Sequence, residues 1–147
     1  MAITCLDKQI AELVGKTGHE TLAVWACDCA ERVLQYFEKK HPEDQRPRLA
    51  IEAGRSWART GVFSMADVRK AALAAHAAAR EEGGDDAARS AARAAGHALA
   101  TAHVPSHSIA AAIYAATAVR DGAETVDADA AVAKERGWQY RRLLEMQ

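Results

Sequence analysis

The chain has 147 residues, a formal net charge of −1 and a composition in which half of the residues are hydrophobic. This length predicts a single domain over residues 1–147 with enough chain to bury a core, and the near-zero charge favours neither nucleic acid nor a membrane surface as a partner. No apolar run reaches the roughly 18 residues of a membrane span, and three cysteines without a secretion signal predict reduced thiols and a cytoplasmic location.

Apolar residues recur at helical spacing along the whole chain, between glycine and proline breaks. Pro42 is expected to end one helix, Pro47 suits the first turn of the next, and Gly83-Gly84 separates two alanine-rich helices within residues 67–101. The seven predicted helices cover about 6–14, 19–40, 47–60, 65–82, 86–102, 107–122 and 128–146. Side chains expected to cap helix N-termini are Ser64, Asp85 or Asp86, Ser106 and Asp127.

The order of these elements predicts an all-α fold, because no segment shows the alternation of a strand. Short connectors place consecutive helices antiparallel, as stacked hairpins. Two arrangements satisfy this pattern: a compact bundle, or a short superhelix resembling an α-solenoid. Alanine, the best helix former, allows close packing in either one.

Polar side chains on five successive predicted helices lie at i, i+3, i+4 or i+7 spacing beside an apolar face. In a concave stack these strips would meet on the inner surface and form a polar cleft to which all five helices, from the second to the sixth, contribute. The alternative is a set of local ion pairs on exposed faces, each contributing about 0.2–0.5 kcal/mol. The residues expected to face the common space are Asp28, Arg32, Glu52, Arg55, His76, Arg80 and His97, with His107 as a further member.

Motifs of known chemistry are missing from the sequence. His97, His103, His107 and Asp28 could supply nitrogen and oxygen ligands to a cation, but neither HExxH nor a paired ExxH occurs. The histidines near residue 105 can instead satisfy helix ends. Neither GxSxG nor GxxxxGK[ST] is present. We therefore predict no catalytic residue, no metal and no cofactor.

Four segments resemble a known family of immunity proteins from bacterial toxin–immunity systems, the immunity protein 5-like group. They are WACDCAERVLQYFE (25–38), RPRLAIEAGRSWA (46–58), ADVRKAALAAHAAAR (66–80) and AARAAGHALATAHVPSHSIAAAIYA (91–115). The resemblance implies an all-α, cytoplasmic, bacterial protein that binds and neutralises a cognate toxin. The positions that recur in the family fall here on Asp28, Glu31, Arg32, Arg46, Pro47, Glu52, Arg55, Trp57, His76, Arg80, Gly96, His97, His103 and His107.

Two functional hypotheses follow. The first is an interaction protein that blocks a toxin through surface contacts. The second is a protein that binds a small molecule or a metal, with an enzymatic role included, in a polar inner cleft built from histidine and arginine. A shared set of polar residues keeps the second open, because the contacts of an inhibitor should vary with its toxin, while the family resemblance makes the first our prediction. The residues expected to bind a ligand or partner are Asp28, Arg32, Glu52, Arg55, Trp57, His76, Arg80, His97, His103 and His107.

Overall fold

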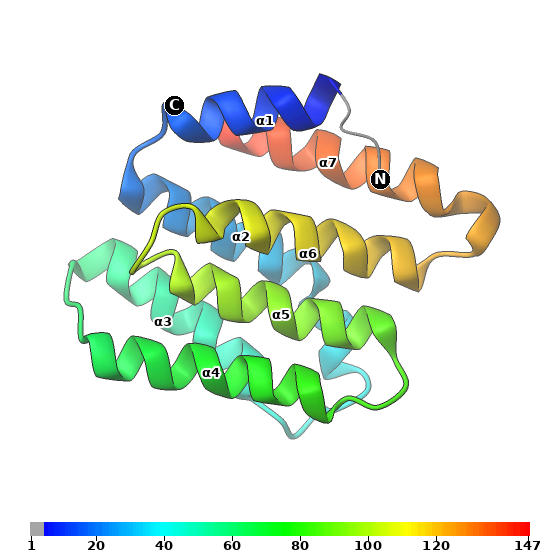
Figure 1. Ribbon diagram of the computed structural model, residues 1–147, viewed down its shortest axis with the longest axis horizontal. Helices are drawn as coiled ribbons and strands as arrows, with labels where there is room; N and C mark the ends of the chain where they lie inside the picture. The colour runs from blue at the N-terminus through cyan, green and yellow to red at the C-terminus, as the bar shows by residue number, and fades with distance from the viewer. Residues whose placement is uncertain (1–4) are drawn as a thin grey trace.

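The computed structural model describes residues 5–147, and this part contains seven α-helices, one 3-10 turn and no strand (Figure 1). The all-α prediction is confirmed, and every predicted helix end lies within two residues of the observed one. The elements are α1 (Cys5–Gly15), α2 (His19–Glu38), α3 (Arg46–Thr60), α4 (Met65–Glu81), α5 (Asp86–Ala100), α6 (His107–Gly122), η1 (Thr125–Asp127) and α7 (Ala128–Glu145).

Two of the predicted N-caps make the expected hydrogen bond. The side chain of Ser64 accepts from the backbone N–H of Asp67, and that of Asp85 accepts from Ala88. The expectation for Ser106 and Asp127 is wrong, because neither side chain makes a capping bond.

Both of these residues have helical backbone angles rather than the extended angles of a cap. Each follows a tight turn that already leads into its helix. Before α6, the N–H of His107 bonds to the carbonyl of Val104. Before α7, the N–H of Ala128 donates to the carbonyl of Thr125 in η1.

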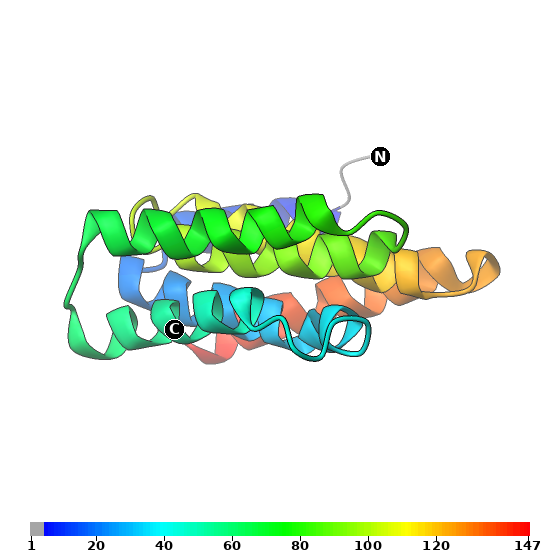
Figure 2. The same ribbon diagram turned by 90° about the horizontal axis from the view of Figure 1, so that it is seen from below.

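The helices form two layers packed face to face (Figures 1 and 2). One layer holds α4, α5 and α6 side by side, and the other holds α3, α2 and α7, while α1 packs along α7 at one edge. Consecutive helices run antiparallel, as the short connectors predicted. Contacts between α2 and both α5 and α6 cross the two layers. A solenoid repeat contacts only its neighbours in sequence, so the arrangement is the compact bundle.

Helix α5 lies at the centre of the molecule, flanked by α4 and α6 and resting on α2 and α3. Ten of its 15 residues are buried, and seven of these are alanine. Because small side chains fill little volume, the neighbouring helix backbones must approach α5 closely to reach native packing density. One such close approach is at Gly54 of α3, where an added Cβ would lie 2.8 Å from Cys27 Sγ and 3.6 Å from Leu99 Cα.

Larger side chains of α2 complete the core, and Trp25, Leu34 and Phe37 are almost fully buried. The indole N–H of Trp25 donates to the carbonyl of Gln139, which ties α2 to α7. None of the helices in residues 5–147 combines the length and apolar character needed to cross a bilayer.

Candidate functional site

The structure places the predicted polar residues on two opposite outer faces of the molecule instead of in one inner cleft. The buried side of α2 packs on α5, and Asp28 lies on the outward side of α2. His97 lies on the side of α5 that faces away from the layer of α2, α3 and α7. Alanine side chains fill the space between the layers, and ionised groups avoid such an interior because their desolvation is costly. Thus His76 and His97 do not converge with Asp28 and Arg55.

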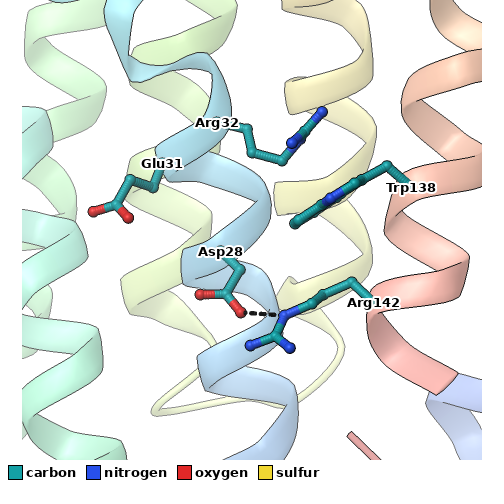
Figure 3. Close-up of a pocket in the computed structure, with 5 residues that line it drawn as sticks. All are labelled: Asp28, Glu31, Arg32, Trp138 and Arg142. Atoms are coloured by element: carbon teal, nitrogen blue, oxygen red, sulfur yellow. Dashed lines mark hydrogen bonds and ion pairs between the residues drawn. The ribbon is translucent and has the colours of Figure 1, made fainter. Parts of the chain in front are cut away.

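The first face is formed by α2, α3 and α7, and it carries an open hollow of about 440 Å³ (Figure 3). Asp28 lies between two guanidinium groups: Arg55 donates to its Oδ1 at 2.9 Å and Arg142 to its Oδ2 at 3.0 Å. Arg55 also donates to Glu31 at 3.1 Å. Asp28 therefore links three helices through charge-assisted hydrogen bonds. The hollow is lined by Asp28, Glu31, Arg32, Trp138 and Arg142.

Arg32 occupies the other side of this hollow. It donates to both carboxylate oxygens of Glu135, at 2.8 and 3.0 Å. Its guanidinium lies over the Trp138 ring, 4.0 Å from the ring centroid, and Figure 3 shows these two side chains together. The Glu135 side chain is only 8% exposed, so it needs this partner to remain ionised. The hydrogen bond to Glu135 raises the pKa of Arg32 above its ordinary value.

The charged groups that line this hollow are therefore satisfied internally, and their contacts hold α7 against α2. Sequence reasoning missed Glu135, Trp138 and Arg142 as partners of the predicted residues, because their contacts join positions more than a hundred residues apart. The spacing of these three residues, at i, i+3 and i+7 on α7, is the one signal of a shared helix face in the sequence.

The second face is formed by α4, α5 and α6 and carries a cluster of three histidines. The rings of His76 and His97 meet edge to face with their centroids 4.9 Å apart. His97 Nδ1 lies 3.0 Å from His107 Nδ1, in a hydrogen bond that needs at least one neutral imidazole. The ring of Tyr114 stacks on His97, with 5.3 Å between centroids and an 8° interplanar angle. The predicted polar strips of three helices thus meet here.

Two of these imidazoles are neutral near pH 7. Desolvation by burial, followed by the positive charges of Arg93 and Arg80, lowers the pKa of His76 to about 4. Desolvation, followed by the neighbouring histidines and Arg93, lowers that of His97 to about 4 as well. His76 Nδ1 is buried without a hydrogen-bond partner. Its ring lies over Gly96, where an added Cβ would come within 2.7 Å of His76 Nε2.

The arginines around this cluster differ from Arg32, Arg55 and Arg142 of the first face, which all bind carboxylates. Neither Arg80 nor Arg93 makes a hydrogen bond or an ion pair with a carboxylate in the described part of the chain. Arg80 was predicted as a site residue, whereas Arg93 was not. The second face therefore combines neutral imidazoles with guanidinium groups that lack a counter-charge.

Three further predicted residues lie outside both clusters. Glu52 is exposed on α3. Trp57 is half-buried near the start of α2, where its ring packs against His19 with centroids 4.7 Å apart. His103 is exposed in the connection between α5 and α6 and stacks on Phe63 at 6.3 Å.

The described residues offer no metal site, and the two buried cysteines offer no reactive thiol. Within residues 5–147, no group of three or more histidine, cysteine, aspartate or glutamate side chains is placed to hold a metal ion. Cys27 and Cys29 are fully buried. Desolvation raises the pKa of Cys27 to about 12 and that of Cys29 well above its ordinary value, so neither forms the thiolate that a nucleophile or metal ligand requires.

Comparison with known protein families gives a match over most of the chain. A family model described as "Imm-5 like putative immunity protein" matches residues 12–146. Neither the curated proteins nor the solved structures gave a match.

Proposed function

The chain belongs to the Imm-5 like immunity protein family, and on this basis we propose that it binds a cognate bacterial toxin in the cytoplasm and neutralises it by direct contact. The observation that carries the proposal is the extent of the family match, which includes every helix from the middle of α1 to the end of α7. The proposal assigns a protein partner and no catalytic residue.

The geometry supports a binding surface better than a small-molecule site. Pockets for small ligands are concave and enclose most of the ligand. The hollow lined by Arg32 and Trp138 is open to solvent instead (Figure 3). An inner cleft would need His76, His97, Arg55 and Asp28 to converge, and these residues lie on opposite faces. The polar residues are therefore available to a partner that contacts the outer surface.

The direct experiment is co-expression with the candidate toxin encoded by a neighbouring reading frame. We expect growth to be rescued and the two proteins to co-purify from the same cells. Replacing the fully buried Ala91 of α5 by aspartate supplies the control, because a buried unpaired charge unfolds the core and should abolish rescue. If the native chain neither rescues growth nor co-purifies with the toxin, direct neutralisation is excluded.

A further inference from the structure

We propose that the outer face of α4, α5 and α6 docks an acidic segment of the partner toxin. This inference rests on the proposed function and assigns the face and the chemistry of the contact. The surface is defined by His76, Arg80, Arg93, His97 and His107, and we call it the basic surface.

The first argument is charge pairing. On the opposite face, Arg32, Arg55 and Arg142 each donate to a carboxylate of this chain. Arg80 and Arg93 have no such partner in the described residues. A guanidinium without an internal acceptor keeps its N–H donors for a carboxylate supplied from outside, which it can bind with two parallel hydrogen bonds.

The second argument is the sign of the local field. Every charged group that acts on His76 and His97 is basic, which leaves the two rings neutral and the field positive. Carboxylates of these helices lie near the helix ends. Asp86 pairs with Arg89, Asp121 pairs with Arg120 and Glu81 pairs with Arg46, and Asp67 in the first turn of α4 is not among the groups that act on either histidine. A positive surface of this kind attracts and orients an acidic partner.

The third argument is the apolar and aromatic content of the same face. Leu73 is 54% exposed and lies on the strip of α4 that also carries Arg69 and Arg80, at i+4 and i+7 spacing. His97 of α5 and Tyr114 of α6 add a pair of stacked rings to the same face. Protein interfaces combine aromatic and arginine side chains with an apolar centre. The basic surface therefore suits a protein segment that carries both acidic and apolar residues.

The first test measures binding of poly-L-glutamate to the purified full-length protein at low salt. We expect binding that weakens as salt is added, and a loss of affinity of about tenfold or more in the R80E/R93E variant. The matched control is K134E/R141E, which makes the same change in net charge at two exposed residues of α7 on the opposite face. Circular dichroism verifies that both variants stay folded, and R80Q/R93Q repeats the test without charge reversal.

Three results would overturn the inference: no binding of poly-L-glutamate, an equal loss in the control variant, or tighter binding of a single-stranded DNA oligonucleotide. The second test is toxin rescue with the same two variants. Loss of rescue in R80E/R93E alone supports the inference. Rescue by R80E/R93E at the native level refutes the inference and leaves the proposed function intact. A native chain that binds poly-L-glutamate but no toxin refutes the proposed function instead.

Discussion

Replacing Gly54 by alanine tests the close packing of α3 against α2 and α5. A Cβ at this position would lie 2.8 Å from Cys27 Sγ, which is too short for a van der Waals contact. The sulfur cannot move outward, because Cys27 is fully buried and its thiol points to the carbonyl of Ile51 at 3.6 Å. The backbones of α3 and α5 must therefore separate, or the Cys27 side chain must leave its rotamer.

The expected magnitude follows from two opposing effects. Overpacking a core by one methyl group costs about 1–3 kcal/mol, while replacing glycine by alanine inside a helix gains about 1 kcal/mol. The G54A variant should therefore lose about 1 kcal/mol of unfolding free energy. Removing the sulfur in C27A should also cost about 1 kcal/mol, as expected for one buried heavy atom.

The double variant C27A/G54A gives the decisive value. Its new methyl group fills the space that the sulfur leaves, so G54A should gain about 1 kcal/mol in the C27A background. The coupling between the two substitutions is then about 2 kcal/mol. Urea denaturation followed by circular dichroism measures all four free energies, and 1 kcal/mol corresponds to about 2–4 °C in melting temperature.

A control distinguishes the packing effect from helix propensity. In G137A of α7, the added Cβ would meet only the flexible end of the Arg141 side chain at 3.1 Å, so this variant should gain up to about 1 kcal/mol. The reasoning is refuted if G54A stabilises the native chain as G137A does. It is also refuted if G54A has the same effect with and without the Cys27 sulfur.

Three further predictions concern protonation, ion pairing and capping. The pKa of His76 and of His97 is about 4 in the fold, against an ordinary value of 6.5. Between pH 4 and 6.5 the unfolded chain therefore binds more protons than the folded chain. The unfolding free energy should therefore fall as pH is lowered from about 7 to 4, and chemical denaturation should show a shallower slope in H97Q. In R32A the buried Glu135 loses its partner, so urea denaturation should show a loss of about 1–2 kcal/mol that shrinks on acidification. S64A should cost about 1 kcal/mol, measured by thermal unfolding, because it removes the cap of α4.

The sequence by itself determined the helices. The signals that mark a helix lie within a few residues of one another. They are the glycine and proline breaks, the apolar spacing and the two correct N-caps, and they suffice where the apolar stripe that faces the core is clear. The two capping errors have a local cause as well: Ser106 and Asp127 have the right side chains, but the turns before them already adopt helical angles. The resemblance also identified the family, because it depends on the order of short segments along the chain.

Only the tertiary structure decided where the polar strips lie relative to one another. A helical wheel gives the direction of a side chain about its own helix axis, and it carries no information about which helix lies opposite. Asp28 and His97 each lie beside an apolar stripe, yet their helices pack stripe to stripe and direct the two residues to opposite faces. The partners supplied by α7, among them Arg142 and Glu135, likewise depend on a layer arrangement that no local pattern encodes. Alanine packing leaves no room for charges between the layers, so the ionised groups lie outside. Arg32, Arg55 and Arg142 bind carboxylates on one face, whereas Arg80 and Arg93 on the other have no carboxylate partner in the described residues.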